Sequence, residues 1–233
     1  MSWLFRTSID SDVEEIDPDL PEHCTVAILG TGLAGLGTGI RLAKAGRGDF
    51  VLLEQAIGVR ANVRRRALES GVWAHIRFGT ELRAAEWDAV HSWWRLRTNR
   101  GSMTANFLLV TTEDVSGSVC GRDGRSLQQV WAHEGGRAYP AAAVSGFPNL
   151  FLAHQEQIRM ISSGLKLFAA KGIREFEVRS EVETERPPRR LGRHFYPHDY
   201  HLTVGQPRSG DPRYRPGGEV PRPSAVGAER LAP

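Results

Sequence analysis

Two short apolar runs stand early in the chain, at Cys24–Leu29 and Phe50–Leu53. Short runs that do not alternate with polar residues are typical of strands buried on both faces, as in a parallel sheet. Between them, Leu33–Ala45 has the pattern of a helix and is followed by Gly46, a residue that ends helices readily. The pattern therefore predicts a strand, a helix and a second strand, in that order.

The periodicity of the apolar residues changes several times further along the chain. Helical spacing alternates with the two-residue spacing of strands, which indicates a mixed α/β fold. We expect a helix over 60–75, strands over 76–111 with a turn at Asn99–Gly101, a helix over 154–171 ended by Gly172, and a strand within 174–183.

The composition of the chain changes at residue 184. Residues 184–233 hold nine of the thirteen prolines, nine arginines and no lysine, which leaves little apolar surface to offset the entropy of ordering. Residues 1–23 read as a loose leader. The expected organisation is this leader, one α/β domain over 24–183, and a disordered Arg/Pro-rich tail over 184–233.

The overall composition excludes several classes of protein. Hydrophobic residues make up 40% and charged residues 24%, values typical of a globular chain. No apolar run is long enough to cross a bilayer and no secretory signal is recognisable, so we expect a cytoplasmic protein. Two cysteines are too few for a disulfide framework. The positive charge lies in the tail, and the preference for arginine fits codon bias better than nucleic-acid binding.

A glycine-rich turn joins the first predicted strand to its helix. It reads Gly30, Thr31, Gly32, Leu33, Ala34, Gly35, a G-x-G-x-x-G sequence. The first glycine permits the tight turn, the second lets a pyrophosphate approach the backbone, and the third lets the helix pack closely on the sheet. The amides at the helix N-terminus attract phosphate groups. Strand, turn, helix and strand together predict a Rossmann-type dinucleotide site.

An acid completes this pattern. Glu54 ends the second apolar run and is followed by Gln55. A carboxylate at this position can accept hydrogen bonds from a ribose diol, and it would repel a 2′-phosphate, which disfavours NADP at this site.

Longer patches of the sequence resemble one enzyme family. The segment VAILGTGLAGLGTGIRLAKAGRGDFVLLEQA looks like the FAD fingerprint of flavin-dependent monooxygenases of the Baeyer–Villiger type. Three further patches resemble the same family in the same order and cover most of residues 24–183: SGVWAHIRFGTELRAAEWDAVHSWWRLRTNRGSMTANFLLVTTE, then GRDGRSLQQVW with RAYPAAAVSGFPNLF, and HQEQIRMISSGLKLFAAKGIREFEVR. The resemblance implies FAD bound by Gly30–Gly35, Glu54 and Gln55, NADPH and O₂ as co-substrates, and a ketone-like small-molecule substrate.

The chain also departs from the family. Family members are longer and carry a Gly-Gly-Thr-Trp run, a Tyr-Pro-Gly segment, the F-x-G-x-x-x-H-x-x-x-W fingerprint and a second dinucleotide motif for NADPH, none of which occurs here. After the apolar strand the family has Ala-Thr-Gly, where this chain has Thr111-Thr112-Glu113. What is retained would hold the adenosine and diphosphate of FAD. We therefore expect an internally truncated chain and assign no catalytic residue.

Four other groups of residues could carry chemistry. His194, His198, Asp199 and His201 could ligate zinc, although Pro197 and flanks that look disordered argue against it, so no metal is expected. Arg60, Arg64, Arg65 and Arg66 fit a solvated helix face better than a phosphate site. Trp87, Trp93 and Trp94 fit a core better than a stacking platform. Cys24 and Cys120 lack a histidine at catalytic spacing.

Three functions remain open at this point. The first is an FAD-dependent oxidoreductase, a monooxygenase that uses NADPH and O₂. The second is a catalytically silent remnant of such an enzyme that still holds a dinucleotide. The third, supported by composition alone, is an acidic-partner or nucleic-acid binder acting through the tail.

Overall fold

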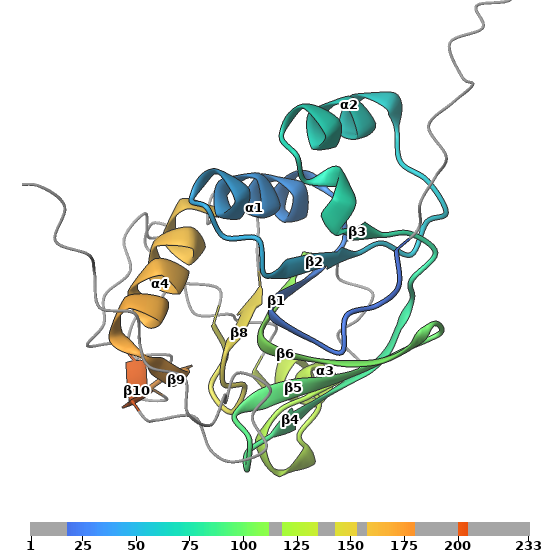
Figure 1. Cartoon of the computed structure of the whole chain (residues 1–233). Coiled ribbons are helices and arrows are strands. Elements are labelled where there is room, and N and C mark those ends of the chain that lie inside the picture. The colour runs from blue at the N-terminus through green and yellow to red at the C-terminus, as the bar shows by residue number, and fades with distance from the viewer. Residues whose placement is uncertain (1–17, 112–117, 135–142, 153–157, 180–199, 205–233) are drawn as a thin grey trace, which may run out of the picture.

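A mostly parallel sheet forms the centre of the protein (Figure 1). The computed structural model describes residues 18–111, 118–134, 143–152, 158–179 and 200–204. The parallel part of the sheet contains β3 (Ile76–Arg77), β2 (Phe50–Leu53), β1 (His23–Leu29), β6 (Gly101–Val110) and β8 (Leu150–Leu152), in that spatial order. The first β–α–β unit is therefore present as the sequence predicts, and the α/β fold class is confirmed.

Strand β6 changes its neighbour halfway along. Its second half pairs in parallel with β8 at Leu108–Val110. Its first half pairs with the antiparallel strand β5 (Trp93–Thr98), which in turn pairs with β4 (Leu82–Asp88). The short strand β7 (Val119–Cys120) closes this edge. The turn between β5 and β6 lies at residues 99–100, where the sequence predicts it.

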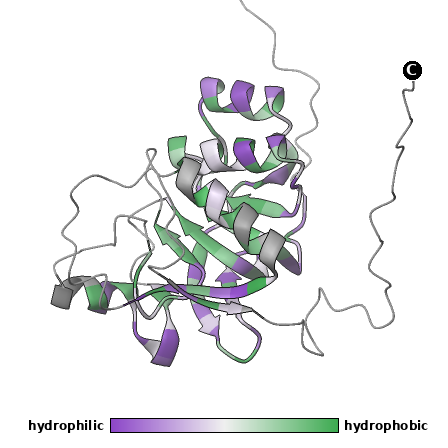
Figure 2. Cartoon of the chain, turned by 90° about the vertical axis from the view of Figure 1, so that its left-hand side faces the viewer, coloured by the Kyte–Doolittle hydropathy of each residue, from purple (hydrophilic) through white to green (hydrophobic). Residues whose placement is uncertain are grey.

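Helices cover one face of the parallel sheet. They are α1 (Leu33–Lys44), α2 (Ala61–Glu69) and α4 (Ile158–Lys171). The short helix Trp73–His75 and a separate two-stranded sheet, β9 (Ile173–Val178) with β10 (Tyr200–Val204), accompany them. Alternate strand residues such as Ile28, Leu52 and Leu109 pack against them in one core. Figure 2 shows the strands largely green, whereas the outlying helix α2 carries long purple stretches.

The antiparallel strands cover the opposite face. Here Ala27, Leu53 and Leu108 pack against Trp94 and Leu96 in a second core. Helix α3 (Leu127–Glu134) adds Leu127 and Val130 to it, and the turn Arg122–Gly124 leads into that helix. Side chains of each parallel strand thus point alternately into the two cores. Because both faces of the strand are buried, its sequence is an unbroken run of apolar residues.

Most predicted boundaries agree with the structure within a few residues. The helix expected over 60–75 ends at Glu69, because Gly71 turns the chain with φ +71° before the short helix at Trp73–His75. The helix expected over 154–171 is described from Ile158 on. Gly172 follows it with φ +62°, as a helix terminator should.

The structure describes part of each segment that flanks the expected domain. The leader is expected to be loose over 1–23, yet the backbone carbonyl of Asp19 accepts a hydrogen bond from Arg77 and that of Glu22 accepts one from the Thr104 amide. Within the tail expected to be disordered, residues 200–204 form β10 and pair with β9. Residues 1–17, 184–199 and 205–233 of these two segments lie outside the described part of the chain. Among the described residues no helix is long and apolar enough to span a bilayer.

Candidate functional site

A crevice opens at the carboxyl ends of the central strands. The crossover from β1 through α1 leads to β2 on one side of β1, and β6 lies on the other side. Open α/β sheets bind ligands where the strand order reverses in this way. A cavity of about 620 Å³ lies at this point, lined by Leu29, Gly30, Thr31, Gly32, Leu53, Glu54, Gln55, Thr80, Glu81, Leu82 and Thr111.

The three glycines of the turn have three distinct environments. Gly30 has φ +95°, a value that a residue with a side chain rarely adopts, and its amide donates to the Leu53 carbonyl at 2.8 Å. Gly32 faces open space, since a Cβ built on it would meet nothing within 4 Å. A Cβ on Gly35 would lie 2.0 Å from the Gly30 carbonyl oxygen. The turn is therefore tight behind Gly32 and open in front of it.

The N-terminus of α1 faces the crevice without a protein cap. Gly32 is the N-cap residue, no side chain bonds to the free amides, and the first turn contains no acidic residue. Leu33 is 61% exposed beside it, whereas Ala34 and Gly35 are buried behind the turn. Unpaired amides and the positive end of the helix dipole together favour an anion at this position.

Glu54 lies beside the turn and is bonded to it. Its Oε2 accepts hydrogen bonds from the Thr31 amide at 2.9 Å and from the Thr31 hydroxyl. Its Oε1 accepts one from the Ala56 amide at 3.0 Å. Because a carboxylate oxygen can accept two hydrogen bonds, Oε1 retains capacity for one more donor. Glu54 therefore stabilises the turn and also presents an acceptor to the crevice.

The structure brings together five of the eight residues predicted to bind the cofactor. Gly30, Thr31, Gly32, Glu54 and Gln55 line the crevice, whereas Leu33, Ala34 and Gly35 begin the helix behind it. The Thr31 side chain is 5% exposed and bonds to Glu54. The cofactor-binding role itself stays a prediction.

Six residues of the crevice are not among the predicted ones: Leu29, Leu53, Thr80, Glu81, Leu82 and Thr111. Thr80 and Glu81 follow β3, whose end pairs with the end of β2. The Thr80 amide donates to the Glu54 carbonyl at 2.9 Å, and the Thr111 amide donates to the Leu29 carbonyl at 3.2 Å. The sequence could have indicated Thr80 and Glu81, because residues that follow parallel strands meet at one edge of the sheet. That prediction would have required identifying Ile76–Arg77 as a separate parallel strand.

The other predicted groups have structural positions. Trp87, Trp93 and Trp94 are 9%, 8% and 0% exposed, which confirms the core interpretation. Trp94 donates its indole hydrogen to the Pro148 carbonyl at 3.0 Å. Arg65 and Arg66 are exposed on α2. The guanidinium of Arg64 lies 5.6 Å from the centre of the Trp73 ring, in a cation–π contact.

The cysteines and the histidine cluster provide no site within the described residues. Cys24 is 2% exposed, and burial raises the pKa of its thiol far above the ordinary value, so it is a core residue and no nucleophile. Of the four possible zinc ligands only His201 is described, and it is exposed. His194, His198 and Asp199 lie outside the described residues, and no cluster of metal-ligating side chains occurs among those that are described.

The fold and crevice define an α/β protein with a glycine turn at the switch point of a parallel sheet. Comparison with curated proteins confirms the resemblance to Baeyer–Villiger monooxygenases over part of the chain. An enzyme of that name from Streptomyces coelicolor is 27% identical over 136 residues, covering 41% of this chain and 26% of the enzyme. A second, from Pseudomonas aeruginosa, is 50% identical over 42 residues, covering 18% of this chain and 8% of the enzyme. No protein-family model matches the chain.

The chain thus spans about a quarter or less of the length of these relatives. Because 41% of 233 residues is fewer than the 136 matched, the Streptomyces enzyme contains residues within the matched stretch that have no counterpart here. Among solved structures, an oxidized steroid monooxygenase bound to NADP has a TM-score of 0.36 at 21% identity over 38% of this chain and 26% of its own. A closed cyclohexanone monooxygenase has a TM-score of 0.37 at 13% identity over 40% of this chain and 26% of its own.

Proposed function

We propose that the crevice binds FAD through its adenosine diphosphate half, and that the chain is the flavin-binding part of an oxidoreductase of the Baeyer–Villiger monooxygenase type. One observation carries the proposal: the uncapped N-terminus of α1 opens at Gly32 onto a cavity of about 620 Å³. The resemblance to monooxygenases supports FAD over other dinucleotides. Two acids at the crevice, Glu54 and Glu81, disfavour a ligand with an additional phosphate on its ribose.

The residues present fit the diphosphate and the adjoining ribose. The free amides at the start of α1 would bind the diphosphate, and Oε1 of Glu54 would accept a hydrogen bond from a ribose hydroxyl. The bonds from Thr31 and Ala56 hold that carboxylate in place before any ligand arrives, which lowers the cost of ordering it on binding. When bound, FAD would supply the redox chemistry, and NADPH, O₂ and a ketone-like substrate follow from the resemblance alone.

Gly32 provides the sharpest test. Its φ of −59° suits any residue and its Cβ position is unobstructed, so Gly32→Val would place a side chain in the path of the diphosphate without straining the fold. Titration calorimetry with FAD should give saturable binding to the unaltered chain and none to the variant, with unchanged circular dichroism. Gly48→Ala is the matched control, because Gly48 lies beyond the other end of α1 with equally open space and should leave binding intact. Equal binding by all three proteins would overturn the proposal.

A catalytically silent dinucleotide-binding chain is the second candidate. It is favoured by the single G-x-G-x-x-G in the sequence, which leaves no recognisable site for NADPH. Anaerobic addition of NADPH to the FAD-loaded chain distinguishes the two: loss of the flavin absorbance near 450 nm on the order of seconds would support the oxidoreductase. A spectrum that stays unchanged while FAD remains bound would support the silent chain.

A further inference from the structure

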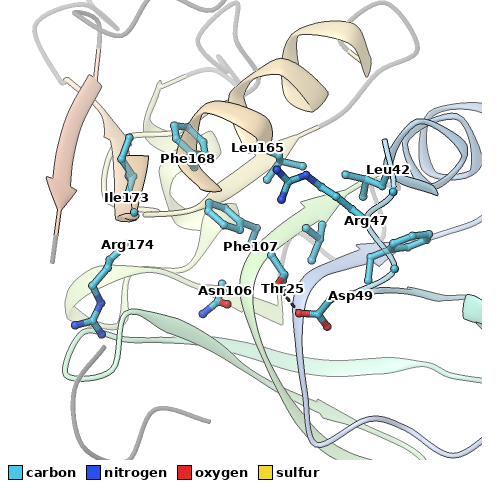
Figure 3. A pocket seen from close by; sticks show the side chains of 15 residues that line it. Thr25, Leu42, Arg47, Asp49, Asn106, Phe107, Leu165, Phe168, Ile173 and Arg174 are labelled. Atoms are coloured by element: carbon cyan, nitrogen blue, oxygen red, sulfur yellow. Dashed lines mark hydrogen bonds between the residues drawn. The ribbon is translucent and has the colours of Figure 1, made fainter. Parts of the chain in front are cut away.

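A second cavity, of about 510 Å³, lies at the amino-terminal edge of the sheet (Figure 3). It is enclosed by the first residues of β1 and β2, the C-terminal end of α1, and the segment from α4 into β9. Its walls belong to the core on the helix face: Val26, Leu42, Phe50, Phe107, Leu165 and Phe168. This size is within the range of ligand pockets, roughly 300–1,000 Å³. The crevice described above lies at the opposite edge of the same strands.

An unpaired cation lies at the mouth of this cavity. Arg47 is half-buried on the loop between α1 and β2, and its guanidinium makes no hydrogen bond or ion pair with the described residues. Figure 3 shows the guanidinium directed toward Leu165 of α4, whereas the nearby carboxylate of Asp49 is bonded to the Thr25 hydroxyl. The partial negative charge at the end of α1 is met by two other cations in its last turn, Arg41 and Lys44. Arg47 therefore remains available to a ligand.

Asn106 also borders the cavity, but its amide does not face a ligand there. The residue is 2% exposed, and its Oδ1 is 3.2 Å from Nε2 of His23. Its Nδ2 is fully buried, so a molecule in the cavity could not reach it. The cavity thus combines apolar walls with one available cation, Arg47.

We propose that this cavity binds an apolar carboxylate, a short hydrocarbon chain or ring that carries one carboxyl group. The hydrocarbon packs among the aromatic and aliphatic walls, and the carboxylate pairs with Arg47. A guanidinium is well suited to this because its two parallel N–H groups match the two oxygens of a carboxylate. The site is separate from the FAD crevice and does not depend on it.

Octanoate and 1-octanol are the probes, used with the full chain in titration calorimetry. Octanoate is expected to bind one site, more tightly than the uncharged alcohol. Arg47→Gln should weaken octanoate binding about tenfold and leave 1-octanol unchanged, because only the charge-assisted hydrogen bonds are lost. Arg47→Lys should retain part of the preference for the acid. Arg41→Gln, which removes an exposed charge from α1 outside the cavity, is the matched control and should change neither.

Three results would overturn the proposal: no saturable octanoate binding, an equal affinity for 1-octanol, or binding that Arg47→Gln leaves unchanged. The crevice variant Gly32→Val separates this proposal from the preceding one. It should abolish FAD binding and leave octanoate binding intact, since the two cavities lie at opposite edges of the sheet. Loss of octanoate binding in a folded Gly32→Val protein would place the ligand elsewhere and overturn the assignment to this cavity.

Discussion

The two edges of the parallel sheet are built from the same strands but from different groups. At the carboxyl edge, the crevice is shaped by backbone: a glycine turn, free helix amides and a carboxylate fixed by amide donors. At the amino edge, the cavity is shaped by side chains, with aromatic walls and an arginine at the mouth. Figure 3 shows the rings of Phe107 and Phe168 and the aliphatic side chains of Leu42 and Leu165 around this cavity.

This difference bears on what each edge can tolerate. A backbone site depends on a few residues that must stay small, so a single added methyl group damages it. A side-chain site depends on the packing of large residues, so a deletion damages it. Four substitutions would test this difference between the two edges, and their expected costs decrease in the order given.

Truncation at the amino edge should be the most costly change. Phe168 is 1% exposed, and its ring lies 4.7 Å from that of Phe176 and 5.6 Å from that of Phe107, measured between centroids. Phe168→Ala is expected to lower the free energy of unfolding by about 3–5 kcal/mol, since it removes apolar contacts and enlarges a cavity. Urea titration followed by circular dichroism measures this. A loss below about 1 kcal/mol would mean that this wall is not packed.

Addition at the carboxyl edge should be the next most costly. In Gly35→Ala the new methyl carbon would stand 2.0 Å from the Gly30 carbonyl oxygen, so α1 must move away from the turn. We expect a loss of about 3 kcal/mol in the free energy of unfolding. Gly48→Ala, where the methyl group meets nothing within 4 Å, is the control and should be nearly neutral. Equal effects from the two variants would contradict the tight turn.

Removing the Glu54 carboxylate should have a moderate effect. Glu54→Ala leaves the buried hydroxyl and amide of Thr31 without their acceptor, which is expected to cost about 1–2 kcal/mol of stability. Glu54→Gln should recover part of this, because its amide oxygen can still accept one bond. The same denaturant titrations, made without added ligand, separate this structural role from cofactor binding. If Glu54→Ala were as stable as the unaltered chain, the carboxylate would have no part in holding the turn.

The smallest effect concerns pH and the carboxylate of Asp88 at the end of β4. Burial alone would raise the pKa of Asp88, but hydrogen bonds from His91 and Arg95 more than offset it and hold the pKa below its ordinary value. The stabilisation is therefore present above pH about 4 and is lost as the pH falls through the folded-state pKa. Asp88→Asn should flatten the decline in urea midpoint as the pH falls below about 4. Glu86→Gln, in an exposed pair with Arg97, should leave that slope unchanged.

The carboxyl edge could largely be predicted from the sequence, because its geometry depends on glycine positions and strand ends. Gly30, Gly32 and Gly35 each have the environment that their spacing implies. Thr80 and Thr111 were missed because they enter the crevice through strands whose parallel neighbours are distant in sequence. The docking of residues 18–23 and the strand at 200–204 were missed for a related reason, since both depend on long-range backbone pairing.

The amino-edge cavity could not be predicted in this way. Five separate segments of the chain line it, and no short sequence motif contains them all. One residue from each is Thr25, Arg47, Phe107, Leu165 and Ile173. Each apolar member reads as ordinary core in the sequence. Nothing in the sequence around Arg47 distinguishes it from the other arginines of the chain. Its position opposite α4, which the fold determines, is what sets it apart.

The change of partner strand along β6 affects how this strand folds and how well its amides are protected. Strands β5 and β8 pair with successive parts of one side of β6, and β1 pairs with its other side. Because β6 is paired on both sides at Leu108–Val110, the amides of these residues should exchange with deuterium more slowly than those of the other described strands. Its pairing with β1 closes a loop of roughly eighty residues, a slow, long-range step in folding. Without β8, the backbone amides and carbonyls on that side of β6 would be unpaired in the centre of the sheet. A strand of another chain could then pair with them.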